Sequence, residues 1–278
     1  MATGRGQASP RVSAKARVEA LVSELLRGAS GQRGRSALAA WRKPEEDLKR
    51  LFARNYVRDL RRLLGYRELL ALIAKASEIW PRLNRESVNI PQPARMAEMA
   101  AVMHLHFKAA PYRGPEGLAL RGFYVDHGQN LLKRPLVYVN TAHHPVAVVT
   151  TFCHEIGHHM ASDIFRGAGE LVHLFVDADY AAHLDDSTEL AADVIVALAA
   201  YPEPLARKIF GCQTPLSGLV AQAGALGDEQ LEQVRERVEG HFGVNFKSMK
   251  SAPQKLRYLA GMIHFAKLRW ALLEEFDT

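Results

Sequence analysis

The 278-residue sequence predicts an α+β fold that is mostly helical, with one small β-sheet and helical additions at both ends. Three observations support this prediction. Apolar residues recur at helical spacing before residue 110 and after residue 145. Between these regions, residues 117–126 and 136–140 have the alternating apolar pattern of strands and are separated by the turn-forming stretch DHGQN. A hydrophobic content of 48% with 24% charged residues is that of a globular chain that can bury a core.

Local signals define the individual helices. Pro44 and the three acidic residues after it mark a helix start, while Pro81 and Pro202 are expected to end the helices that precede them. Residues 170–184 have no clear pattern, and the sequence contains no internal repeat. The expected helices are 14–27, 44–64, 66–80, 93–107, 145–161, 189–201, 228–240 and 253–276.

The net charge of +6 is unevenly distributed. Residues 1–64 carry 15 Lys and Arg against 6 Asp and Glu. Residues 135–206 carry one basic side chain, Arg166, against 10 acidic ones, and they hold 7 of the 12 histidines. A region rich in histidine and carboxylate but poor in lysine and arginine is suited to a hard or borderline cation. The alternative at this point is a merely acidic surface.

Cysteine content and hydropathy favour a cytoplasmic protein. The two cysteines, Cys153 and Cys212, lie far apart in the sequence and form no disulfide framework, which fits a reducing compartment. No window approaches 18 consecutive apolar residues, and the N-terminus lacks the apolar stretch of a secretory signal. An organellar location is the weaker alternative, since residues 1–18 contain Arg, Ser and Ala but no acid.

The stretch TTFCHEIGHHM contains a candidate zinc half-site. His154 and His158 are four residues apart, so on a helix both imidazoles project from one face. His159 lies about 100° further round the helix and is not part of the pair. Glu155 is placed to reach a metal-activated water as a general base. The competing interpretation is a polar helix face with a structural histidine pair.

A third ligand is expected downstream, on the helix within DDSTELAADVIVALAAYP. The metzincin pattern fails, because Ile164 stands where a third histidine would be required. Glu189 can complete a His2Glu, gluzincin-like site, and Asp193, one turn later, can accept the outer N–H of a ligating histidine. Glu189 could instead be a capping-box residue with Asp186, and Asp193 a solvated acid. The rival third ligands are His183, Asp185 and Asp186.

With LVYVN before the first helix, these residues resemble the ImmA/IrrE family of metallopeptidases over about residues 117–202. That family shows a strand ending in Asn, a helix with His-Glu-x-Gly-His, and a second helix with Glu-x-x-Ala-Asn/Asp that ends shortly before Pro. His154, Glu155, His158 and Glu189 fall on the family's ligand and base positions. The departures are Cys153 for Ala, Asp193 for Asn, Ala-Tyr-Pro for Leu-Met-Pro, and about 30 residues between His158 and Glu189. Cys153 is interpreted as a small buried hydrophobe rather than a redox residue.

The resemblance implies a zincin-like peptidase core with a Zn2+ cofactor at 111–210. The remaining divisions expected are a flexible basic tail at 1–44, an N-terminal helical region at 45–110 and a C-terminal helical region at 211–278. It also implies a cytoplasmic endopeptidase of narrow specificity that cuts a regulatory, repressor-like protein with a helix-turn-helix domain, often in a stress response. A second donor would have to stabilise the oxyanion of the reaction. The candidates for it are Tyr138, His144, Tyr180, His183 and Tyr201.

A second function class stays open: a nucleic-acid-binding or regulatory protein with a structural or vestigial zinc site. Arginines at helical spacing in the N-terminal region could give a weak contact with DNA, although a solvated helix face is the commoner meaning of this pattern. The retained base and the open fourth position of the zinc site argue against a structural role, because structural sites are usually closed and rich in cysteine. The arginines concerned are Arg50, Arg54, Arg58, Arg61 and Arg62.

Overall fold

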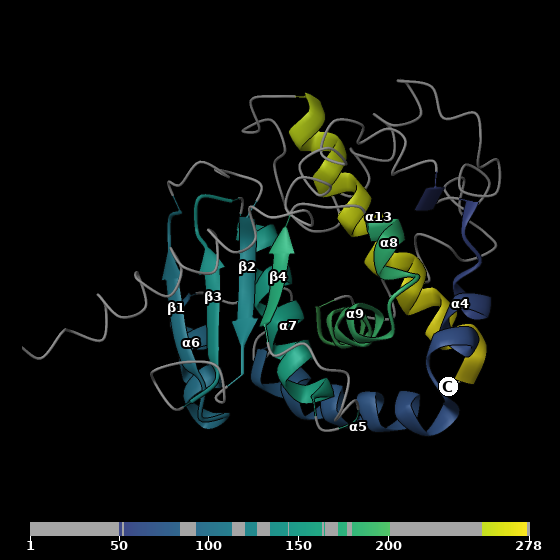
Figure 1. Cartoon of the computed structure of the whole chain (residues 1–278), viewed down its shortest axis with the longest axis horizontal. Coiled ribbons are helices and arrows are strands. Elements are labelled where there is room, and N and C mark those ends of the chain that lie inside the picture. The colour runs from purple at the N-terminus through teal and green to yellow at the C-terminus, as the bar shows by residue number, and fades with distance from the viewer. Residues whose placement is uncertain are drawn as a thin grey trace, which may run out of the picture.

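The structure, a computed structural model, shows a mixed helical and β fold in which a small sheet and a group of helices lie side by side (Figure 1). It describes residues 50–51, 53–83, 93–112, 120–126, 134–143, 145–162, 164, 172–176, 180–200 and 252–276. Its elements are α4 (Tyr56–Leu63), α5 (Tyr66–Leu83), α6 (Pro93–Val102), β1 (His106–Ala110), β2 (Leu120–Val125), β3 (Leu136–Asn140), α7 (Pro145–Ala161), β4 (Val172–Val176), α8 (Tyr180–His183), α9 (Ser187–Ala200) and α13 (Ala252–Phe276).

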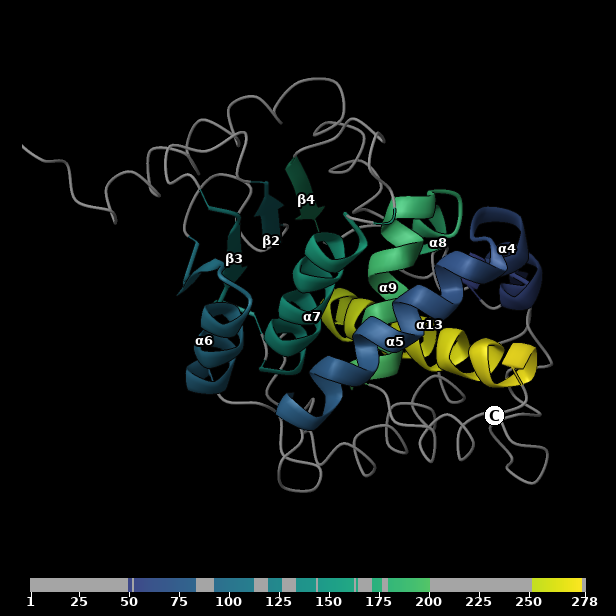
Figure 2. The same cartoon turned by 90° about the horizontal axis from the view of Figure 1, so that it is seen from below.

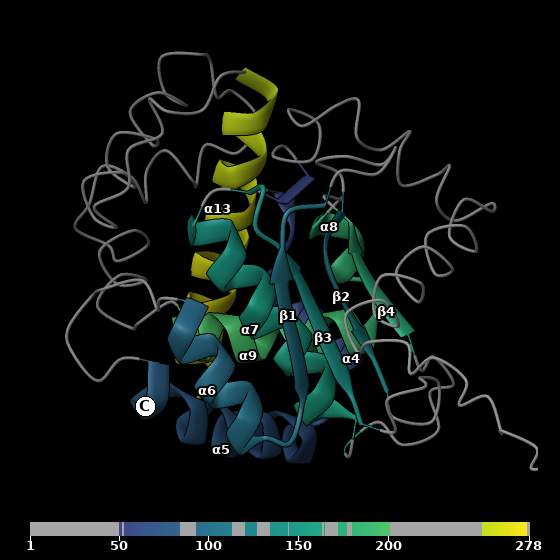
Figure 3. The same cartoon turned by 90° about the vertical axis from the view of Figure 1, so that its left-hand side faces the viewer.

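The sheet has the strand order β1-β3-β2-β4 (Figure 3). β1 runs parallel to β3, while β2 is antiparallel to both β3 and β4. β2 and β3 are buried along their whole length, and α7 packs against both. The sequence predicted β2 and β3 but missed both edge strands, β1 and β4.

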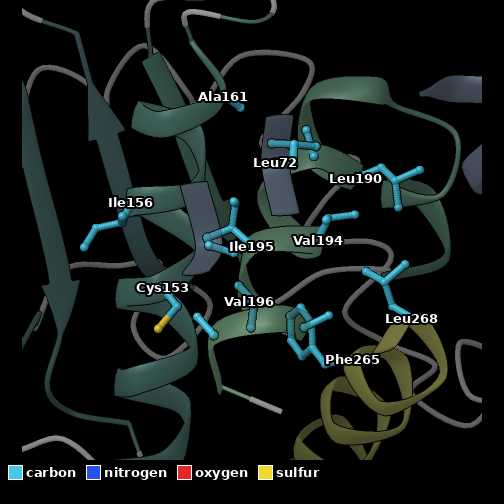
Figure 4. Packing of buried hydrophobic residues seen from close by; sticks show 14 of the residues in the cluster. Leu72, Cys153, Ile156, Ala161, Leu190, Val194, Ile195, Val196, Phe265 and Leu268 are labelled. Carbon is cyan, nitrogen blue, oxygen red and sulfur yellow. The ribbon is translucent and has the colours of Figure 1, made fainter. Parts of the chain in front are cut away.

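α9 lies at the centre of the helical part, between α7 and α13, and α5 crosses beneath it (Figures 1 and 2). Most of its apolar side chains, Val194 and Val196 among them, are fully buried between those of α7 and α13 (Figure 4). A helix that is apolar nearly all round must be buried on every side, as α9 is. The helix that carries Glu189 and Asp193 is therefore the core helix of the fold.

The close approach of α7 and α9 depends on Gly157. A Cβ atom built on this residue would lie 2.8 Å from both the Cα and the carbonyl oxygen of Ala192. Since backbone cannot move aside as a flexible side chain can, only glycine lets the two helices approach this closely at Gly157. The glycine inside the His-Glu-x-x-His stretch thus sets the distance between the two site-bearing helices.

Two N-terminal predictions were wrong in detail. The helix expected over 44–64 is broken at Arg54 and Asn55, where Asn55 caps a new helix by accepting the backbone N–H of Arg58. The helix expected to end near Pro81 continues to Leu83.

The helix expected over 93–107 ends at Val102. His104 has a φ of 57°, its N–H bonds to the carbonyl of Ala101, and the N–H of Leu105 bonds to the carbonyl of Ala100. This pair of hydrogen bonds is a Schellman motif, which ends a helix and usually has glycine at the left-handed position. Histidine at that position conceals the helix end in the sequence, and β1 follows at once.

The helices predicted at 145–161, 189–201 and 253–276 are confirmed to within two residues at each end. The predicted helices at 14–27 and 228–240, and the predicted tail at 1–44, lie outside the described residues.

Candidate metal centre

The two histidines of the His-Glu-x-x-His stretch face each other on α7. The Nε2 atoms of His154 and His158 are 3.0 Å apart, with the two rings nearly perpendicular. Both side chains are buried, because apolar residues flank them on α7 and turn this part of the helix into the core. One helical turn thus brings two imidazole nitrogens to one point inside the protein.

Glu189 reaches the same point from the first turn of α9. Its Oε2 atom is 3.2 Å from Nε2 of His154 and 3.6 Å from Nε2 of His158. The capping role belongs to Asp186, whose Oδ1 accepts the backbone N–H groups of Thr188 and Glu189. With α9 capped in this way, the Glu189 carboxylate extends toward the histidines, and its side chain is 24% exposed. The site therefore meets the surface at Glu189.

The spacing of these three atoms fits a tetrahedral metal ion. Bonds of about 2.0–2.1 Å in a tetrahedral site place neighbouring ligand atoms roughly 3.3 Å apart. The separations among the His154, His158 and Glu189 atoms are 3.0, 3.2 and 3.6 Å. Two imidazoles and one carboxylate are also the donor set that zinc takes in sites with one open position.

Glu155 is buried next to His154 in the sequence, and among the described residues neither of its carboxylate oxygens has a hydrogen-bond partner. Burial raises its pKa well above the ordinary value, and the charges of His154 and Glu189 also act on it. A Cβ atom at Gly122 on β2 would lie 3.2 Å from Oε1 of Glu155, so the missing side chain leaves room for the carboxylate. Buried carboxylates normally have partners, which makes this one a candidate functional group.

Asp193, one turn after Glu189, binds three imidazoles. Its Oδ1 is 2.8 Å from Nδ1 of His154, and its Oδ2 is 2.8 Å from Nδ1 of His183 and 2.9 Å from Nε2 of His264. Although burial opposes it, the surrounding imidazoles hold the pKa of Asp193 well below its usual range. An ionised carboxylate only accepts hydrogen bonds, so each of these three nitrogens donates to it.

This pattern assigns the tautomer of His154. With its Nδ1–H donated to Asp193, Nε2 is the nitrogen that faces His158 and Glu189 and can bind a cation. Burial lowers the pKa of His154, but the Asp193 and Glu189 carboxylates outweigh it and raise this pKa to about 10. Of the two carboxylates, Glu189 is the one that lies where Nε2 points, and its negative charge favours a bound proton or a metal ion there.

Of the rival third ligands, only His183 lies near the site. Its Nε2 is 3.9 Å from Oε2 of Glu189, and its ring stacks at 5.6 Å on that of His154. Asp185 instead accepts hydrogen bonds from Arg54 and Arg62. His154, His183 and Asp193 form a second group that could hold a metal. Its facing atoms already have hydrogen-bonding separations of 2.8 Å, which favours the group with Glu189.

The other described candidates for oxyanion stabilisation, Tyr138 and Tyr180, already form hydrogen bonds within the protein. The Tyr138 hydroxyl donates to the carbonyl of Ala110, and burial raises its pKa to about 12. The Tyr180 hydroxyl accepts from Nη1 of Arg121. His144 and Tyr201 lie outside the described residues.

Two smaller expectations about α7 concern residues beside the ligand pair. His159 points away from the pair and bonds the Tyr124 hydroxyl at 3.1 Å. Cys153 is buried, and burial raises its pKa to about 12, which agrees with a small hydrophobe rather than a reactive thiol.

The arginines near the N-terminus form ion pairs within the chain. Arg54 and Arg62 pair with Asp185, Arg54 and Arg58 pair with Asp59, and Arg61 pairs with Glu275. These side chains hold α4 against the start of α9 and against α13.

Sequence reasoning missed two residues of the site region, His264 on α13 and Tyr56 on α4. His264 binds Asp193 and, through Nδ1, the Tyr56 hydroxyl at 3.0 Å. A lone histidine 71 residues from its partner has no local signature. The available hint in the sequence is that His264 stands among apolar residues of α13, where a polar side chain needs a partner.

Among the described residues, no helix is both long and apolar enough to cross a membrane. Comparisons with protein-family models, with curated proteins and with solved structures found no match for the chain.

Proposed function

We propose that the protein is a zinc-dependent peptidase of the ImmA/IrrE type, with His154, His158 and Glu189 as metal ligands. The observation that carries the proposal is the convergence of two imidazole nitrogens and a carboxylate oxygen within 3.6 Å of one another. The buried carboxylate of Glu155, the residue after His154, has no hydrogen-bond partner in the described part of the chain. A purely structural site would have no use for that carboxylate, since burying it without a partner is costly.

Zinc bound by these residues supplies a Lewis acid that lowers the pKa of water toward about 7 and polarises a carbonyl group. Glu155 would take the proton from the water as its oxygen bonds to the carbonyl carbon, and would deliver it to the amine as the C–N bond breaks. Neither carboxylate oxygen is bonded to another described residue, and this suits the role because both can exchange a proton. Gly122, directly beside it, keeps the space that the carboxylate needs.

Among the described oxyanion candidates, His183 is best placed. Its Nε2 atom faces Glu189, and its Nδ1–H is held by Asp193. The Asp193 and Glu189 carboxylates raise the pKa of His183 against the effect of burial. A protonated His183 would donate Nε2–H to the oxygen of a polarised carbonyl group.

The resemblance noted in the sequence extends the proposal to a cytoplasmic endopeptidase that cuts a regulatory, repressor-like protein. The rival function, a DNA-binding protein with a structural zinc site, is less well supported. Its basic helix face is engaged in internal ion pairs, and the candidate ligands include no cysteine.

Zinc content and peptide cleavage test the proposal together. The protein is purified, loaded with zinc, and incubated with a library of unstructured peptides, and new peptide ends are detected by mass spectrometry. We expect one zinc per chain and cleavage that a chelator abolishes. Glu189→Ala should lose the zinc, whereas Glu98→Ala, which removes an exposed glutamate on α6, should keep it.

Two results would overturn the proposal. One is a zinc content that does not change in Glu189→Ala. The other is cleavage that persists in both Glu155→Gln and the chelator-treated protein, since neither the base nor the metal would then be needed.

A further inference from the structure

The buried carboxylate of Asp193 is tied to two helices from opposite ends of the chain. His264 on α13 donates its Nε2–H to Oδ2 of Asp193, at 2.9 Å. The Tyr56 hydroxyl on α4, 208 residues away in sequence, bonds Nδ1 of the same ring at 3.0 Å. The resulting chain of hydrogen bonds runs from Tyr56 through His264 and Asp193 to His154.

The His264 ring is held firmly in this chain. It is fully buried, Tyr180 stacks on it at 5.1 Å, and Phe265 packs edge-on at 4.9 Å. Tyr56 is 4% exposed, and the ammonium group of Lys267 lies 4.8 Å from the centre of its ring. Because packing fixes both rings, the direction in which His264 presents its nitrogens is fixed as well.

The Tyr56 hydroxyl and the Asp193 carboxylate together fix which nitrogen of His264 carries the proton. A neutral imidazole has one donor and one acceptor nitrogen, and the acceptor must face the hydroxyl hydrogen. With Tyr56 donating to Nδ1, the proton of His264 lies on Nε2, aimed at Asp193. Without the hydroxyl, Nδ1 of His264 loses its donor, and Asp193 alone holds the ring and its tautomer.

The orientation of Asp193 in turn fixes the orientation of the candidate ligand His154. Its Oδ2 is shared by His183 and His264, and this leaves Oδ1 directed at Nδ1 of His154. If Oδ2 lost one donor, the carboxylate could rotate in its pocket, and the His154 ring would lose its fixed orientation. Partners of this kind affect metal affinity by about 10- to 100-fold in zinc enzymes.

We propose that Tyr56 and His264 are positioning residues that set the metal affinity of the centre, by holding Asp193 in the orientation that directs Nε2 of His154 at the metal. The inference rests on the proposed metal site, and it assigns a specific role to the docking of α4 and α13 against α9. These two helices complete the metal site although they contribute no ligand.

The test compares zinc dissociation constants, measured by competition with a chelating dye, in four variants of the full chain. Tyr56→Phe should weaken zinc binding by about 10-fold and His264→Leu by up to about 100-fold. His264→Gln keeps a donor for Asp193 and an acceptor for Tyr56, so it should recover most of the affinity lost in His264→Leu. Glu275→Gln breaks the Arg61–Glu275 ion pair between the same two helices and should leave zinc affinity unchanged.

A second measurement distinguishes a change in the orientation of the ligands from a general loosening of the packing of α4 and α13. Cobalt in place of zinc gives a visible absorption band whose intensity reports the coordination geometry. Tyr56→Phe should change this band, whereas Glu275→Gln should not, even if both lower the melting temperature of the metal-free protein.

The possible failures are distinguishable. If Glu189→Ala abolishes zinc binding while Tyr56→Phe and His264→Leu bind zinc as tightly as the wild type, the positioning role is refuted and the metal site stands. If Glu189→Ala leaves the zinc dissociation constant unchanged, the metal site and the positioning role are both refuted.

Discussion

Gly157 and Ala192 are in backbone contact: a Cβ atom added at Gly157 would lie 2.8 Å from both Cα and O of Ala192. Gly157 directly precedes His158, and Ala192 directly precedes Asp193. The separation of α7 and α9 at this point therefore fixes the distance between the histidine pair and the carboxylates of the opposite helix.

Gly157→Ala should force α7 and α9 apart. We expect a loss of about 1–3 kcal/mol in the free energy of unfolding, the usual range for overpacking, together with weaker zinc binding. Urea denaturation and zinc competition measure the two effects. Gly65→Ala is the matched control, because the added Cβ would meet only the movable end of the Glu68 side chain. Equal behaviour of the two variants would contradict the claim that this helix contact sets the site.

Glu155→Gln should retain zinc and lose hydrolysis by at least 100-fold. The amide has nearly the same shape as the carboxylate but cannot take a proton from water, and general-base catalysis typically contributes 10²- to 10⁴-fold. Zinc content and the release of new peptide ends are measured on the same preparation. A variant that keeps zinc and cleaves at a near-normal rate would exclude Glu155 as the base.

His104→Gly should stabilise the protein. His104 occupies the left-handed position at the end of α6, where a side chain costs about 1–2 kcal/mol and glycine does not. Part of this gain is offset by the greater freedom of glycine in the unfolded chain, so about 0.5–1 kcal/mol is expected. His104→Ala keeps the strain and serves as the control. If urea midpoints rose equally in both variants, the left-handed conformation would not be the cause.

The ion pairs of Asp185 should stabilise the protein at neutral pH and lose that effect in acid. Hydrogen bonds from Arg54, and then from Arg62, lower the pKa of Asp185 to about 2. The folded pKa lies below the unfolded value of about 3.9, so the stabilisation is complete above that value and disappears as the pH falls toward 2.

Asp185→Asn measures this contribution. Because Asp185 is 56% exposed, the loss at pH 7 should be no more than about 1 kcal/mol. The difference in urea midpoint between wild type and variant should narrow progressively below pH 4. A difference that was constant from pH 7 to pH 2.5 would show that the charge of Asp185 is not responsible.

The sequence predicted the parts of the fold and site that depend on local pattern. Four-residue spacing placed His154 and His158 on one face of α7, and the same spacing placed Glu189 and Asp193 on α9. Whether Glu189 capped its helix or faced the histidines could not be decided locally. That depends on Asp186 taking the cap and on Gly157 bringing the two helices together.

Other features depended on tertiary contacts or on atypical residues. β1 was missed because His104 replaces the expected glycine at the end of α6. The helix break at Asn55 was missed because the apolar period continues through it. The bond of His264 to Asp193 joins segments 71 residues apart, so no spacing rule could have predicted it.

X-ray absorption of the zinc-loaded protein at the zinc edge tests the central claim most directly, because it reads the atoms bound to the metal. The account predicts two imidazoles with further light oxygen-type donors, all at about 2.0–2.2 Å, and the loss of this signal in Glu189→Ala. A sulfur shell near 2.3 Å, a third imidazole that closes the open position, or an unchanged spectrum in Glu189→Ala would contradict it.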